Sequence, residues 1–394
     1  MLSAGFVLFL SAAYLGLLFA VARFGDARAD AGKSIISANV YALSLAVYCT
    51  SWTFYGSVGR ATSGGLSFLT IYIGPTLMLL CVGVIIKMIR ISKAQRITSI
   101  ADFIASRYGK SQLLAGLVTV IAVIGVVPYI ALQLKAVSAS LQILFQTSGG
   151  EFLPGMIDST FIIAALLALF TILFGTRHLD ATERHEGMVA AIAFEAVVKL
   201  AAFLAVGVFV TYGMFGGLSD LFQRAAASPE LARLLQMDSS RAETWTALIL
   251  LSGLAIIFLP RQFQIIVVEN VDEAHLKRAV WLFPLYLVAI NIFVLPLALG
   301  GLLHFQGQGF TPDTFVLTLP LARGAESLAL LVFIGGLSAA TGMVIVETIA
   351  LSTMVCNDLV MPVLFRIKVL RLSERADLSG LLLAIRRITI VIGM

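Results

Sequence analysis

Long apolar runs alternate with short polar connections along almost the whole chain. A helix needs about 20 predominantly apolar residues to cross a bilayer, and most of the runs reach that length. The pattern therefore predicts an all-α polytopic membrane protein with about ten helices. The runs cover 2–22, 37–58, 67–89, 112–144, 159–177, 187–215, 244–268, 279–303, 325–356 and a tenth that begins near Ile388. The tenth run holds only seven residues up to Met394, so we expect the chain to be truncated within helix 10.

The composition agrees with a chain that lies mostly in lipid. Hydrophobic residues make up 59% of the 394 positions and charged residues only 12%, against about 25% charged residues in a soluble domain. The net charge is +5, but the basic residues lie between the apolar runs. They predict a lipid bilayer as partner and no nucleic acid. The cysteines form no CxxC pair and the histidines do not cluster with acids, so we expect neither a catalytic site nor a zinc site.

The lysines and arginines are distributed unevenly between the two sets of connections. Alternate connections with their flanking helix ends hold 19 of the 27 basic residues, and the opposite set holds five. Because cytoplasmic loops carry the excess of basic residues, helix 1 should enter the cytoplasm and the N-terminus should lie outside. The basic set comprises connections 23–36, 90–111, 178–186, 269–278 and 357–387. Within it, the amphipathic segment 97–110 predicts a connecting helix at the interface.

Ionisable residues inside the apolar runs are the first candidates for function, because each costs about 2.5–3.5 kcal/mol to insert. Glu195 and Lys199 are four residues apart in the favourable order for an ion pair. They predict an intramembrane charge pair that either neutralises itself or takes part in coupling. Lys135 follows Pro128 and either faces a cavity or extends to the interface. Glu347 has no obvious partner and is a candidate proton carrier.

Two of the runs contain polar residues where an uninterrupted helix would be apolar. In GLAIIFLPRQFQIIVVEN (253–270), Pro260 is followed by Arg261, Gln262 and Gln264. This order predicts a discontinuous helix that lines a site, unless the helix simply ends at Phe258. The second run carries Tyr48, Cys49, Thr50, Ser51, Trp52 and Thr53. Its hydroxyl groups either bond their own backbone or line a pocket for a small solute.

The ninth run places small and hydroxyl residues on one helix face. Ser338, Thr341 and Gly342 have i, i+3, i+4 spacing. Such a face permits close helix packing. Its hydroxyl and carbonyl oxygens could alternatively bind a hard monovalent cation. The pattern leaves both interpretations open.

Taken together, five segments resemble the sodium/solute symporter family, and within it the transporter-like N-terminal domain of CbrA-type sensor histidine kinases. They are YALSLAVYCTSWTFYGSVGRA (41–61), PYIALQLKAVSAS (128–140), TRHLDATERHEG (176–187), LPRQFQIIVVEN (259–270) and WLFPLYL (281–287). The resemblance implies a LeuT-type inverted-repeat fold with an extra N-terminal helix. One symporter-like transmembrane domain would then cover 1–394. Its first repeat would span about 37–215, and its second, incomplete repeat about 244–394.

The resemblance also implies where solute and coupling ion bind. The solute would lie between broken helices 2 and 7, near Ser51, Trp52, Arg261, Gln262 and Gln264, with Arg261 facing a substrate carboxylate. Ion coupling would involve Tyr48, Cys49, Ser338, Thr341, Gly342 and Glu347. Helix 2 offers no carboxylate here, and Gly342 stands where the family has a second hydroxyl. These departures favour proton coupling or ligand sensing over coupling to Na⁺.

We therefore expect a solute:cation symporter-like module of a bacterial inner membrane, with a periplasmic N-terminus. Its solute would be small and polar, an amino acid with histidine as one candidate. The resemblance implies that the module is the input domain of a two-component sensor histidine kinase. Kinase domains and a response regulator would be partners of the full-length protein. This chain shows no kinase motif. The alternatives are a receptor domain that senses without transport, and a sodium-coupled symporter proper.

Overall fold

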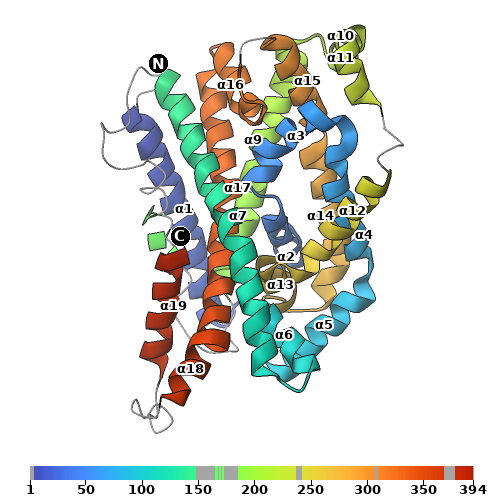
Figure 1. Ribbon diagram of the computed structural model, residues 1–394. Helices are drawn as coiled ribbons and strands as arrows, with labels where there is room; N and C mark the ends of the chain where they lie inside the picture. The colour runs from blue at the N-terminus through green and yellow to red at the C-terminus, as the bar shows by residue number, and fades with distance from the viewer. Residues whose placement is uncertain are drawn as a thin grey trace.

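The structure is a computed structural model. It describes residues 4–147, 165–166, 168–169, 171–172, 185–236, 242–306, 309–367 and 378–393. Over these ranges the chain is helical with no strand, and most helices run roughly side by side along one axis (Figure 1). Six described helices are long and apolar enough to cross a membrane, and a bent pair makes a seventh. The prediction of a multi-pass helical membrane protein is confirmed. Most of the predicted run 159–177 lies outside the described residues.

The second apolar run folds into a broken helix. Helix α1 (Ala4–Asp30) precedes it and packs against α9 (Glu186–Val208). The broken helix then begins with α2 (Ala38–Ser44), capped by the Ser37 side chain, and continues as a 3-10 turn, η1 (Leu45–Tyr48). At Cys49 the backbone becomes extended. The helix resumes as η2 (Trp52–Gly56), a π-helical turn, and α3 (Ser57–Gly64).

The segment from 65 to 147 crosses between the two ends of the bundle. It comprises η3 (Gly65–Leu69), α4 (Thr70–Leu80), α5 (Val82–Gln95), α6 (Ile100–Arg107) and α7 (Gln112–Thr147). Ser99 caps α6 by accepting a hydrogen bond from the Asp102 backbone N–H. The predicted connecting helix within 97–110 is therefore present, between α5 and α7 at the lower end of the bundle (Figure 1).

The seventh apolar run also folds into a broken helix. After α9, the chain forms η4 (Phe209–Met214), α10 (Leu218–Ala227), α11 (Pro229–Ala232) and η5 (Arg233–Leu235). Helix α12 (Ala242–Phe258) follows, then α13 (Pro260–Phe263) and η7 (Gln264–Val268), with a bend of 54° between the two parts. Leu259 has an extended backbone, because a residue before proline disfavours the helical region. The predicted discontinuity is confirmed.

The last part of the chain supplies the central helix. Helix α17 (Glu326–Met354) is buried along nearly its whole length and contacts α7, α9 and α16. The tenth run was predicted to begin near Ile388, after Arg386 and Arg387. This start was wrong, because α19 (Ser379–Gly393) includes both arginines and begins at Ser379. The other elements are α14 (Ala274–Asn291), α15 (Val294–His304), η8 (Pro312–Thr314), α16 (Phe315–Ala322), η9 (Val355–Val360), α18 (Met361–Arg366) and α19 (Ser379–Gly393).

Candidate functional site

The two helix breaks lie close together in the middle of the bundle. The end of η1 contacts α9, α13 and α17, and α13 also contacts α17. Four ionisable side chains from these helices are buried there: Glu195, Lys199, Arg261 and Glu347. A helix break frees backbone carbonyls and N–H groups, so it is a place where charged groups can find partners within a membrane. The candidate site is therefore built around these breaks.

The ammonium group of Lys199 binds the break in the first broken helix. Its Nζ donates hydrogen bonds to the backbone oxygens of Ala46, at 2.7 Å, and Cys49, at 2.8 Å. The side chain extends from α9 and is only 2% exposed. The chain leaves the helical path at Cys49, so its carbonyl is available to an outside donor. Lys199 therefore joins α9 to the break.

The carboxylate of Glu195 has a different partner, on α17. Thr341 Oγ1 donates to Glu195 Oε1 at 2.6 Å. The other oxygen, Oε2, lies where a side chain at Gly342 would be: a Cβ there would stand 2.3 Å from it. Among the ion pairs of the described ranges, none joins Glu195 to Lys199, although their charges interact. The predicted pair is thus two neighbouring groups with separate partners.

A second pair of charges links α13 to α17. Arg261 Nη1 donates to Glu347 Oε2 at 2.6 Å, and both side chains are buried. The guanidinium carbon also lies 5.1 Å from the centre of the Tyr129 ring, within the range of a cation–π contact. The sequence predicted that Arg261 would face a substrate carboxylate and left Glu347 without a partner. In the structure Glu347 supplies that carboxylate.

Several buried polar atoms near these charges have no hydrogen-bond partner within the described structure. They include Arg261 Nε, Glu347 Oε1 and both side-chain atoms of Gln262. Gln262 is 0% exposed. Buried polar groups are normally hydrogen-bonded, so this region has unused capacity to bind water or a polar ligand.

Three polar residues that the sequence analysis missed complete the region. Tyr14 of α1 shares a hydrogen bond with Ser338 Oγ of α17. Gln133 Oε1 of α7 accepts hydrogen bonds from Ser51 N at 2.9 Å and Ser51 Oγ at 2.6 Å, and Tyr129 bonds Thr50 Oγ1 at 2.7 Å. A single tyrosine or glutamine in an apolar helix carries no periodic signal. Only the position of Gln133, between Pro128 and Lys135, could have indicated it.

A cavity of about 440 Å³ opens beside the break of the first broken helix. It is lined by Ser51 and Trp52, which the sequence analysis assigned to solute binding, and by Lys135, for which a cavity was one of two alternatives. Asp313 of η8 also lines it, and so does Gln133. Burial raises the pKa of the Asp313 carboxyl. Arg261, Gln262 and Gln264 do not line this cavity. The predicted solute-binding set therefore divides into a cavity group and an internal group.

Gln264 belongs to a polar cluster at the other end of the second broken helix. Gln264 Nε2 donates to Glu269 Oε1 at 2.8 Å. The backbone N–H of His185 donates to Glu269 Oε2 at 2.9 Å, and its Nδ1 lies 3.0 Å from Oε1. Burial alone would raise the pKa of Glu269, but His185 and these hydrogen bonds hold it below its usual value. Tyr41 adds a hydrogen bond to the Ile266 carbonyl at 2.7 Å. This cluster joins both broken helices toward the α5–α6 end.

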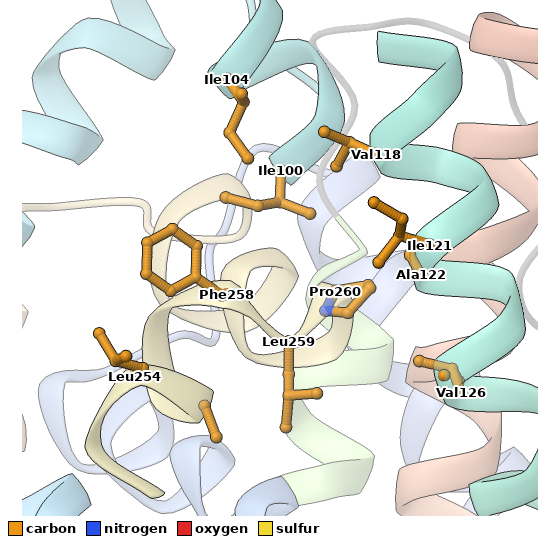
Figure 2. Close-up of a pocket in the computed structure, with 12 residues that line it drawn as sticks. Ile100, Ile104, Val118, Ile121, Ala122, Val126, Leu254, Phe258, Leu259 and Pro260 are labelled. Carbon is orange, nitrogen blue, oxygen red and sulfur yellow. The ribbon is translucent and has the colours of Figure 1, made fainter. Parts of the chain in front are cut away.

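A second cavity, of about 460 Å³, lies at the bend at Leu259 and Pro260. Figure 2 shows side chains from α6, α7 and α12 around it. All of its lining residues are apolar or glycine: Ile100, Ile104, Val118, Ile121, Ala122, Gly125, Val126, Leu254, Ala255, Phe258, Leu259 and Pro260. It offers no side-chain hydrogen bond to a polar solute, so it is not the candidate solute site. In the described part of the chain, no cluster of His, Cys, Asp or Glu could hold a metal ion.

The architecture defines the fold of the chain. A multi-pass bundle with two broken helices that meet beside buried charges is the LeuT-type symporter arrangement. A solved structure with a similar fold is described as the substrate-bound outward-open state of a Na⁺-coupled sialic acid symporter. It matches with a TM-score of 0.69 at 15% identity, over 98% of this chain and 78% of that one. The all-helical symporter fold predicted from the sequence is confirmed.

Curated relatives by sequence are two proteins of Bacillus subtilis (strain 168). The uncharacterized symporter YhjB is 25% identical over 294 residues, which is 74% of this chain and 56% of YhjB. The uncharacterized symporter YodF is 29% identical over 123 residues, 31% of this chain and 24% of YodF. The chain thus spans little more than half of the length of YhjB. No family model matches it. It is similar in sequence to proteins named as symporters.

Proposed function

We propose that this chain is a solute:cation symporter-like module that binds a small polar solute in the cavity beside the first helix break. The cavity carries the proposal. It places Ser51, Trp52, Lys135 and Asp313 together, next to the break that Lys199 holds. A pocket with an apolar ring and a few convergent polar groups is typical of a small-molecule site. The similarity to YhjB and to the sialic acid symporter fold supports the same class.

The solute class that fits this cavity is an amino acid, with histidine as one candidate. Lys135 offers a positive charge to a carboxylate, and Asp313 offers a negative charge to an ammonium group. Trp52 can stack against an aromatic or imidazole ring. Arg261 already binds Glu347, so a solute carboxylate would have to displace Glu347 to reach it. We therefore assign solute recognition to the cavity group.

The coupling ion in this proposal is a monovalent cation, Na⁺ or H⁺. The residues assigned to coupling are Tyr48, Cys49, Ser338, Thr341, Gly342 and Glu347, together with Glu195 and Lys199. Lys199 contacts the break directly, and Thr341 contacts the Glu195 carboxylate directly. The two-repeat division at about 37–215 and 244–394 is part of the same proposal.

We further propose that the module serves as the input domain of a sensor histidine kinase in a bacterial inner membrane, with its N-terminus outside. The support is the likeness of its segments to CbrA-type kinases and the excess of basic residues on one side. Kinase domains and a response regulator would then be partners of the full-length protein. The alternative, a receptor that binds solute without transport, is favoured by the same cavity.

Binding of labelled histidine and other amino acids to the purified full-length protein tests the solute site. Lys135→Gln and Asp313→Asn should each weaken binding about 10-fold or more, since each removes a charged hydrogen bond of about 1.5–3 kcal/mol. Lys87→Gln, on the exposed face of α5, is the matched control and should bind like the wild type. If both cavity variants bind as tightly as the control, the cavity is not the solute site.

A further inference from the structure

The apolar cavity at Leu259 and Pro260 has space for a hydrocarbon ligand. Its volume is about 460 Å³, and its lining side chains carry no polar atom. An apolar cavity of about 150 Å³ stays dry and binds benzene, so a cavity roughly three times as large accommodates a longer hydrocarbon. Figure 2 shows Ile100, Ile121 and Phe258, from three different helices, around this space.

The cavity opens on the lipid-facing surface of the bundle. Two of its lining residues are large and exposed, Ile121 of α7 at 62% and Phe258 of α12 at 51%. Along the same helices, Ile124 is 68% exposed and Leu251 is 62% exposed. Helix α7 is a membrane span, and α12 forms the bent span together with α13. Apolar side chains exposed on such helices contact lipid tails, so the cavity is open to a lipid acyl chain.

The third wall of the cavity, α6, carries a basic residue next to the lining. Ile100 and Ile104 line the cavity. Arg107 follows Ile104 by three residues and therefore lies on the same side of the helix. Arg107 is exposed, and its guanidinium group donates to Gln95 Oε1 at 2.7 Å and lies 5.8 Å from the centre of the Phe103 ring. Both of these partners are uncharged, so they leave its positive charge available to an anion.

The segment that contains α6 has an excess of positive charge. Residues 93–110 include four basic residues and one acid, Asp102. The Asp102 carboxylate accepts a hydrogen bond from the Thr98 backbone N–H. Basic residues beside a membrane span attract anionic phospholipids, and the planar guanidinium group of an arginine fits a phosphate group. The charge of this segment therefore complements an anionic head group.

We propose that this cavity holds one acyl chain of an anionic phospholipid, whose phosphate group binds Arg107 of α6. The acyl chain packs against both parts of the second broken helix, because Leu254 belongs to α12 and Pro260 belongs to α13. The polar cavity beside the first helix break is lined by a different set of residues. The lipid and the solute therefore have separate sites, and the lipid site does not depend on whether the chain transports a solute.

Native mass spectrometry of the full-length protein measures binding of dioleoyl phosphatidylglycerol and of zwitterionic dioleoyl phosphatidylcholine. The anionic lipid should bind more tightly. Ala122→Phe places a ring in the cavity and should weaken binding of both lipids about 10-fold or more, since each buried methylene group contributes about 4-fold. Ile124→Phe, exposed on the same helix, is the matched control. Arg107→Gln should weaken binding of the anionic lipid alone, by about 5-fold. Its control is Arg366→Gln, exposed on α18.

Two binding results would overturn the inference. One is lipid binding by Ala122→Phe that equals binding by the Ile124→Phe control, and the other is equal affinity of the wild type for the two lipids. Cryo-electron microscopy of the wild type in nanodiscs of brominated phosphatidylglycerol needs no variant, so it decides even if Ala122→Phe does not fold. Bromine density beside Leu259 and Pro260 would support the inference. A cavity without lipid density, or one that holds an apolar molecule without a phosphate group, would contradict it.

Discussion

At the scale of single residues, the centre of the molecule depends on partners that hold each buried charge. Arg261 and Glu347 contact each other at 2.6 Å with almost no exposure. Breaking a buried ion pair by removal of one partner leaves an uncompensated charge, whereas replacing both partners by apolar residues can be neutral. Each residue of the pair is therefore needed to balance the buried charge of the other.

Removal of one member of this pair should be far more costly than removal of both. We expect Arg261→Met or Glu347→Leu alone to lower the free energy of unfolding by about 3–5 kcal/mol. The double variant should recover most of that loss. Denaturant unfolding in detergent micelles measures the four proteins. Equal losses in the single and double variants would contradict the assignment of an internal ion pair.

The Asp313 carboxyl should give solute binding a dependence on pH. Its pKa is raised by burial above the ordinary value of about 3.9. Solute binding should therefore be strongest near neutral pH and weaken as the pH falls through the raised pKa, because the protonated acid no longer attracts an ammonium group. Asp313→Asn should remove this dependence and bind weakly at every pH. Binding titrations of both proteins from pH 7 to about pH 4 test this; identical pH profiles would show that Asp313 does not contact the solute.

At the scale of elements, the two broken helices bring the buried charged residues together. The bend of 54° at Leu259 brings α13 toward α17 and so brings Arg261 to Glu347. Pro260 cannot donate a backbone hydrogen bond and directs Leu259 away from the helical region. A straight helix would carry Arg261 along the axis of α12.

Pro260→Ala tests the role of this bend. Alanine permits a continuous helix and removes a cost of about 3 kcal/mol for proline inside one, so the segment from α12 to η7 should straighten in part. We expect the Arg261–Glu347 contact to weaken and solute exchange to slow. Exchange rates and spin-label distances between α12 and η7 report the two effects. An unchanged distance together with an unchanged rate would mean that tertiary packing, not the proline, sets the bend.

Local patterns predicted the elements better than the contacts between them. The apolar runs and the order Pro260, Arg261, Gln262 predicted the membrane helices and the second break, because both depend on neighbouring residues. The partners of Lys199 are backbone carbonyls of another helix, and the Glu347 partner is 86 positions away. Tyr14 and Asp313 come from apolar or loop segments without periodicity. Such contacts depend on tertiary packing, and a single sequence contains no local signal for them.

At the scale of the whole molecule, the two sides of the site differ. The side near η8 has the polar cavity with Trp52 and Asp313. Toward the α5–α6 end, Glu269 binds His185 and Gln264, and Tyr41 binds the second broken helix. Lys199 contacts the break of the first broken helix, and its charge also interacts with that of Arg261 in the second broken helix.

The most direct measurement of this account is exchange of labelled amino acid by the full-length protein in proteoliposomes that contain Na⁺, alongside binding to the same preparation. The account predicts that the solute which binds is also exchanged, and that an inward gradient of Na⁺ or H⁺ drives its accumulation. Binding without any exchange would contradict it and would identify the module as a receptor that senses its solute without moving it.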